Sequence, residues 1–205
     1  MSFDHWWFSC HLTPADEEHF QPVFVNAEKQ AALAPNTEEI FQYWQAHPER
    51  FSSEWEYSVP VEERTRHVEW YNRFVWAFNL PGYTELGEEV ASFLDEETCF
   101  RFIIIRRCSP GAVLWHCLGY ERASLLPGNK GNIFLTASQV EGALIKAENA
   151  MKGLVLDEAI QKGLALAGHS NQEQDIFSVI THLSDGLLYA YENGKGFMAV
   201  ARPQL

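Results

Sequence analysis

The stretch 98–107 is apolar on both sides of an extended chain, and this constrains the fold more than any other feature. Its apolar residues are Phe100, Phe102 and Ile104 on one side, and Ile103 and Ile105 on the other. Successive side chains of a strand point to opposite faces of a sheet. A strand that is apolar on both faces is typical of the centre of a sheet that is covered on both sides. We therefore expect a central strand here.

Two turn signals predict how the sheet is connected. Ser109-Pro110-Gly111-Ala112 separates this strand from a second apolar stretch, so we expect a central hairpin over 98–122. Asn193-Gly194 lies between two further apolar runs, and this dipeptide readily adopts the positive φ angles of a tight hairpin turn. We expect a C-terminal hairpin over 187–201, with strands near 187–192 and 195–201.

Capping residues and helical periodicity predict several helices around these strands. Thr13-Pro14-Ala15-Asp16 and Thr136-Ala137-Ser138-Gln139 carry N-cap chemistry, and Gly168 is a stop signal. We expect a short helix after Thr13, helices near 36–47, 60–79, 84–95, 136–151, 157–167 and 172–184, and strands at 3–12 and 133–135. The order lacks regular βαβ alternation, so the sequence predicts an α+β fold with a mixed or antiparallel sheet. We expect one domain over 1–205, with a possible seam near residue 97.

The cysteines and histidines give no recognisable metal or disulfide pattern. Cys10, Cys99, Cys108 and Cys117 lack CxxC spacing, and no two of them face each other in the register expected for the hairpin 98–122. His5, Cys10, His11 and His19 are spaced too loosely for a zinc motif. We expect reduced thiols, no metal and no cofactor, with His116 as a hydrogen-bonded histidine in the core or at an edge; a zinc site built from the N-terminal group and distant ligands stays open as a less favoured alternative.

The sequence shows no catalytic signature. It has no GxSxG elbow, and the glycines at 128–131 and 194–196 lack the spacing of a phosphate-binding loop, so we interpret both as turns. We name no catalytic residue. An enzyme stays open as the less favoured class.

Charge divides the chain sharply. Residues 1–97 hold nineteen acids and five bases, a net charge of −14, while residues 98–205 hold nine acids and ten bases, a net charge of +1; together these give the overall −13. Six of the seven tryptophans lie in the acidic half. Such a chain is repelled by nucleic-acid phosphates and by anionic membrane surfaces, so we expect neither as a partner. Neither a membrane-spanning run nor a signal peptide is apparent, so we expect a cytoplasmic protein.

The charge split and the missing chemistry together predict a binding protein. Negative charge accelerates encounter with a basic partner, and Trp and Tyr supply buried anchors. Small acidic proteins of this kind often act as inhibitors, as immunity proteins do when they neutralise a nuclease toxin. Helix 60–79 would hold such contacts rigidly. The predicted contact residues are Glu54, Trp55, Glu56, Tyr57, Glu62 and Glu63.

Two alternatives stay open. Trp55 and Tyr57 can instead face the core, with the neighbouring glutamates merely solvated. The whole chain can instead be a small-molecule enzyme or a ligand-binding domain with a site between its two halves. A deep pocket with converging polar groups would favour the ligand-binding class, and an acidic surface with exposed aromatic residues would favour the protein-binding class.

Overall fold

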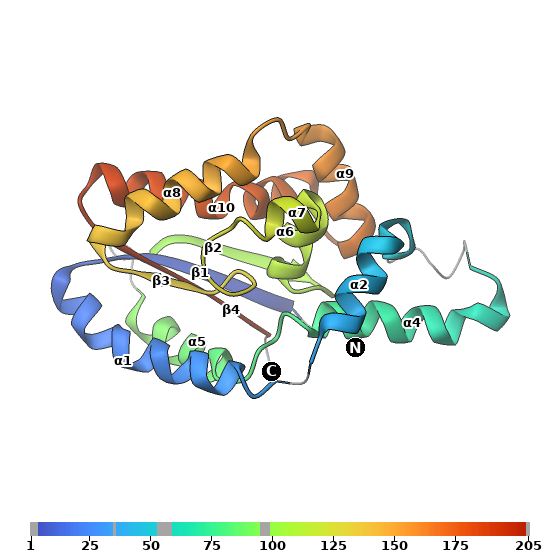
Figure 1. The fold of residues 1–205 in the computed structure, drawn as a ribbon, viewed down its shortest axis with the longest axis horizontal. Helices are drawn as coiled ribbons and strands as arrows, with labels where there is room; N and C mark the ends of the chain where they lie inside the picture. The colour runs from blue at the N-terminus through green and yellow to red at the C-terminus, as the bar shows by residue number, and fades with distance from the viewer. Residues whose placement is uncertain (1–3, 35, 53–58, 95–98, 204–205) are drawn as a thin grey trace.

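A computed structural model describes residues 4–34, 36–52, 59–94 and 99–203. In this part of the chain one four-stranded antiparallel sheet lies between two layers of helices, which confirms the α+β prediction (Figure 1). The strand order is β2-β1-β4-β3. The strands are β1 (Asp4–Leu12), β2 (Cys99–Arg106), β3 (Ile133–Leu135) and β4 (Gly196–Pro203). The two central strands therefore come from opposite ends of the chain.

One face of the sheet is covered by α1 (Pro14–Ala31) and α5 (Tyr83–Phe93), which we call the α1/α5 layer. Thr13 caps α1 as expected, because its hydroxyl accepts from the Asp16 amide and the Asp16 carboxylate accepts from the Thr13 amide. The helix is longer than expected and continues past Pro22 for 18 residues in all. Its apolar stripe packs with α5 and with alternate residues of β1 and β4: Phe20, Phe24, Ala27, Leu86, Val90, Phe8, Leu12, Met198 and Val200.

The opposite face carries the larger core. The helices on this side are α6 (Pro110–Leu118), α7 (Tyr120–Ala123), α8 (Ala137–Met151), α9 (Leu156–Ala167) and α10 (Glu173–Glu192). We call them the α10 layer (Figure 1). The capping box expected at Thr136 and Gln139 is present at the start of α8, and Gly168 ends α9.

Three further elements lie beside one end of the sheet: α2 (Glu38–Ala46), the 3₁₀ turn η1 (Pro48–Arg50) and α4 (Val61–Trp76). Their aromatic residues join the core of the α10 layer, so this core draws on residues from both sides of position 97. Trp44 from α2 and Phe74 from α4 stack with ring centroids 5.0 Å apart. β1 and β2, which come from the two sides of that position, also pair along their lengths.

The central hairpin predicted over 98–122 is wrong. Its first strand exists as β2, but β2 lies at an edge of the sheet, and the second strand is replaced by the helix α6. Pro110 occupies the first turn of α6, where a proline is well tolerated, rather than a turn between strands. Almost every residue of α6 is buried. A helix that is apolar all round has no amphipathic stripe, so its sequence resembles that of a buried strand.

The C-terminal hairpin predicted over 187–201 is also wrong. Residues up to Glu192 belong to α10, and only β4 is a strand. Asn193-Gly194 ends the helix: Gly194 has φ 60°, and the Lys195 amide donates to the Ala190 carbonyl at 2.9 Å. This is the glycine C-cap of a helix, which requires the same positive φ as a hairpin turn.

Candidate functional site

The structure places only part of the predicted contact set. Glu62 and Glu63 lie in the first turn of α4, and both are exposed. Arg64 and Arg66 follow on the same helix, so the charge around the two glutamates is nearly balanced. The other four predicted contacts lie outside the described residues: Glu54, Trp55, Glu56 and Tyr57.

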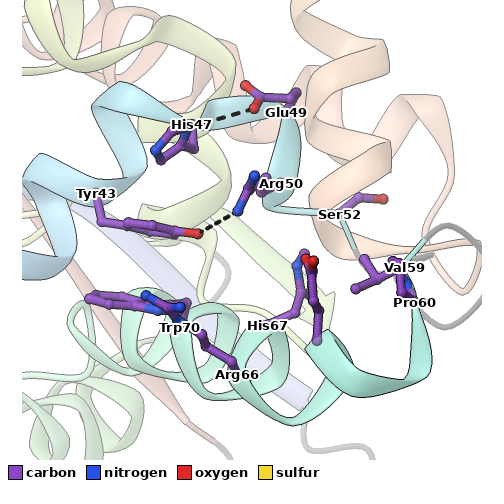
Figure 2. Close-up of a pocket in the computed structure, with 11 residues that line it drawn as sticks. Tyr43, His47, Glu49, Arg50, Ser52, Val59, Pro60, Arg66, His67 and Trp70 are labelled. Carbon is purple, nitrogen blue, oxygen red and sulfur yellow. Dashed lines mark hydrogen bonds and ion pairs between the residues drawn. The ribbon is translucent and has the colours of Figure 1, made fainter.

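Glu63 helps to line a hollow of about 610 Å³, which we call the α2–α4 hollow. Figure 2 shows its aromatic floor, where the rings of Tyr43 and Trp70 stack with centroids 4.2 Å apart. Arg50 donates to the Tyr43 hydroxyl at 3.2 Å, and His47 approaches Glu49 at 3.9 Å.

The positive and negative side chains that line this hollow balance each other. Two arginines and two glutamates line it, so it has no strong preference for an anion or a cation. Burial lowers the pKa of His67, while a hydrogen bond with the Ser52 backbone opposes that shift. The Ser52 hydroxyl donates to the Ala165 carbonyl at 3.3 Å.

Three hollows in the described part of the chain are each lined by residues from one side of position 97. The α2–α4 hollow is lined by residues 43–70, a second one by residues 34–81 and a third by residues 161–173. Each therefore belongs to one side of position 97.

The acidic residues gather on the α1/α5 layer. These two helices together carry seven acids and one base, a net charge of −6. By contrast, α2, η1 and α4 carry six acids and four bases, a net charge of −2. Arg202 partly neutralises this charge, since its Nη1 lies 3.7 Å from Glu88, and His19 Nε2 lies 3.4 Å from Glu89. Among the described helices of the first half, α1 and α5 therefore carry the larger net negative charge.

An apolar strip lies on the sheet face covered by the same layer. It consists of Trp6, Phe102 and Ile104, and we call it the β2 strip. Phe102 stacks on Phe8 of the core at 5.2 Å, yet Phe102 and Ile104 are 45% and 43% exposed. Helices α1 and α5 pack mainly on other strands of the sheet, and β2 is at its edge, so the described helices leave this part of the face partly exposed.

The β2 strip adjoins the acidic helix α5 through a chain of contacts. Arg202 of β4 lies over the Trp6 ring, 5.1 Å from its centroid, and the same arginine pairs with Glu88 of α5. An apolar surface and an acidic helix therefore share one border.

At one end of β2, the Asn171 side chain covers the outer edge of the strand. The Arg106 amide donates to Asn171 Oδ1 at 3.0 Å, and Asn171 Nδ2 donates back to the Arg106 carbonyl at 3.3 Å. Arg101 turns to the other face, where it pairs with Asp185 of α10 at 2.9 Å. An edge strand presents unpaired backbone groups to any partner that approaches it.

Three histidines are buried on the other side of the molecule. His116 is a hydrogen-bonded core histidine as expected, since Trp44 Nε1 donates to its Nδ1 at 2.9 Å. His182 lies against Trp7 with ring centroids 4.2 Å apart. Burial lowers the pKa of His5 and His116 to about 4 and that of His182 to about 3. These imidazoles are neutral parts of the core at neutral pH.

The described residues hold no group of three His, Cys, Asp or Glu side chains that could bind a metal ion. His11 points toward α10, where its ring stacks on Tyr189, while Cys10 belongs to the core under the α1/α5 layer. The loosely spaced N-terminal histidines and Cys10 therefore do not converge. None of the described helices is both long and apolar enough to span a bilayer.

Comparison with protein-family models, with curated proteins and with solved structures finds no match for this chain. The site must therefore be judged on its own geometry.

The β2 strip was not predicted from the sequence, because β2 was expected to lie at the centre of the sheet. Phe102 and Ile104 were expected to be covered, and their exposure follows from the edge position of β2. One signal was available: Arg101, Arg106 and Arg107 frame the apolar run. Charged residues in or beside a strand are typical of edges.

Proposed function

We propose that this chain is a protein-binding domain that docks a basic protein partner and inhibits it, as an immunity protein neutralises a toxin. The observation that carries the proposal is the border between the β2 strip and the acidic helix α5. Acidity alone also suits solubility. Acidity does not account for Phe102 and Ile104, which are large, apolar and exposed side by side on an edge strand.

The surface has the two components that protein recognition uses. The seven acids of the α1/α5 layer would steer a basic partner and raise the association rate. The β2 strip would be desolvated at the centre of the contact and set the dissociation rate. A cationic surface with an apolar centre, such as the active-site face of a nuclease, has the complementary chemistry. Such a partner would place this protein in the cytoplasm.

The earlier contact set stays a prediction about the rim of the same interaction. Glu62 and Glu63 lie at the far end of α4 and carry little net charge with their arginine neighbours. We therefore assign the anchoring role to the β2 strip and leave the segment 54–57 with Glu62 and Glu63 as a secondary contact.

The test begins with a photo-crosslinking amino acid in place of Phe102, introduced in the native host. The matched control carries the same amino acid in place of Ile145, which is 53% exposed on α8 in the opposite layer. We expect one protein of high isoelectric point to crosslink at position 102 and not at position 145.

Binding kinetics measured with the purified partner then distinguish specific binding from chance proximity. Phe102→Ser should speed dissociation, and Glu85→Lys on α5 should slow association and weaken its salt dependence. Ile145→Ser and Glu141→Lys on α8 are the controls and should bind normally. Equal crosslinks at both positions, or a partner that binds the Phe102→Ser variant as tightly as the wild type, would refute the proposal.

A second candidate rests on the α2–α4 hollow, whose stacked Tyr43 and Trp70 could hold a small polar ligand. In that case a small molecule, and not a protein, should raise the melting temperature. Trp70→Ala should remove that shift, whereas Phe102→Ser should leave it unchanged.

A further inference from the structure

Two cysteines face each other across neighbouring strands. In the antiparallel pairing of β1 and β2, Cys10 is the register partner of Cys99. Directly opposed residues of an antiparallel pair project from the same face of the sheet. No two cysteines were predicted to face each other, because Cys99 was assigned to the hairpin over 98–122, where α6 replaces the second strand.

A bulge in β2 fixes the face on which Cys99 lies. The register passes from Ser9 opposite Arg101 to Cys10 opposite Cys99, which leaves Phe100 without a partner. Phe100 contacts the ring of Tyr189 on α10, and Arg101 pairs with Asp185 on the same helix, so both of these side chains point to the α10 layer. The bulge therefore returns Cys99 to the opposite face.

Cys10 lies on that opposite face as well. It is fully buried in the core under the α1/α5 layer, with Phe8 and Leu12 on either side of it in the strand. Opposed residues in an antiparallel pair have Cα atoms roughly 4.5–5.5 Å apart. Disulfides join Cα atoms about 4.4–6.8 Å apart. The pairing of the two strands thus already supplies the separation that a disulfide needs.

We propose that Cys10 and Cys99 form a thiol pair that a low-molecular-weight disulfide, such as oxidised glutathione, converts to a cross-strand disulfide. The Cys99 thiolate attacks one sulfur of the reagent, forms a mixed disulfide and releases one thiolate. The Cys10 thiolate then attacks Cys99 Sγ and releases the second. Both protein thiols are oxidised, the reagent is reduced to two thiols, and the two protons lost by the cysteines pass to the released thiolates.

The order of the two attacks follows from access. Cys99 is half-buried, whereas Cys10 is fully buried, so an external reagent reaches Cys99 first. Burial raises the pKa of both thiols, and the pKa of the more deeply buried Cys10 rises to about 12, so Cys10 is a poor nucleophile toward the reagent. Its attack on Cys99 is intramolecular, so proximity compensates for its low thiolate fraction.

The chain also contains a competing pair. Cys108 and Cys117 are both buried in the core of the α10 layer. Their environment is closed to solvent, so we expect oxidised glutathione to leave them reduced.

The test uses the reduced, purified full chain in glutathione buffers that run from fully reduced to fully oxidised. After acid quenching, denaturation and alkylation, peptide mapping identifies the bonded cysteines. We expect a crosslinked peptide pair that contains Cys10 and Cys99, two hydrogens lighter than the reduced peptides. The oxidised protein should melt about 10 °C above the reduced protein, because the bond closes a long loop in the unfolded chain.

Cys99→Ser should lose both the crosslink and the melting shift, and Cys108→Ser, on the other face of the sheet, should keep both. The wild-type map decides the connectivity even if Cys99→Ser does not fold. The proposal is overturned if Cys99 stops at a glutathione adduct while Cys10 stays alkylatable, if Cys108–Cys117 is the bond formed, or if no bond forms in oxidised glutathione alone.

Discussion

Mild acid should unfold this protein because three buried imidazoles must gain protons. His5, His116 and His182 are neutral in the fold, with pKa values lowered by burial to about 4, 4 and 3. Nearby charges act on each: Asp4 partly opposes the shift at His5, whereas Lys162 and Arg101 add to it at His116 and His182 respectively. In the unfolded chain each would titrate near 6.5.

The sign of the effect follows from proton binding. Below about pH 6.5 the unfolded state binds protons that the folded state does not, so the free energy of unfolding falls as pH falls. At pH 5 each imidazole contributes a loss of about 2 kcal/mol, and the three together about 6 kcal/mol. This is comparable with the ~5–15 kcal/mol that stabilises a typical domain. The window from pH 7.5 to 5 lies above the unfolded pKa values of the carboxylates, which would add their own effects in stronger acid.

Urea unfolding followed by circular dichroism at pH 7.5, 6.5, 5.5 and 5.0 measures the loss. His182→Phe keeps a ring against Trp7 and removes one titrating group. Between pH 7.5 and 5 this variant should lose about 2 kcal/mol less than the wild type. His19→Gln is the matched control, because the His19 side chain is 62% exposed.

The comparison uses the change with pH within each variant, so any effect of the substitution itself at pH 7.5 cancels. The reasoning fails if the wild type is equally stable at pH 5 and pH 7.5. It also fails if His182→Phe and His19→Gln lose stability with pH to the same extent, since burial would then not be the cause.

The remaining predictions concern packing and helix ends, and thermal melts measure all of them. Gly163→Ala should destabilise by about 1–3 kcal/mol, since its Cβ would clash with Ile176 Cγ2. Gly142→Ala, with open space around it, should stabilise by about 0.5–1 kcal/mol. Gly194→Ala should cost about 1–2 kcal/mol because φ is positive there, and an unchanged melt would contradict the C-cap assignment. Trp44→Phe should cost about 1–3 kcal/mol by leaving His116 Nδ1 unpaired in the core, whereas a loss below 0.5 kcal/mol would show that this hydrogen bond contributes little.

The parts of the fold that local chemistry determines could be predicted from the sequence. The capping residues Thr13 and Thr136 placed the starts of two helices, because a cap bonds only to backbone groups within three residues. Gly168 placed the end of α9 for a similar reason. The N-terminal strand was also found, because its aromatic residues favour a strand.

The two hairpin predictions were wrong because the same local sequence pattern is compatible with two structures. The positive φ that Gly194 adopts is needed both in a tight turn and at the end of a helix. The choice depends on whether residues 187–192 pair with another strand or continue α10, and that is decided by packing. The Pro110-Gly111 segment is ambiguous in the same way, since proline suits a turn and also the first turn of a helix.

The expectation that residues 98–107 form a central strand also hid the candidate docking surface. An apolar strand is expected to be covered, and the expected hairpin supplied the neighbour that would have covered Phe102 and Ile104. Once Pro110–Leu118 forms a helix, β2 pairs with β1 alone among the described strands, and the described helices leave Phe102 and Ile104 partly exposed. Charge could be counted from the sequence, but its location could not: α1 and α5 together carry a net charge of −6, whereas α2, η1 and α4, which include the predicted contacts Glu62 and Glu63, carry −2. An apolar anchor and the charges that attract a partner act together only where they lie on one surface. Here the contacts of Arg202 with Trp6 and with Glu88 connect the β2 strip to the acidic helix α5.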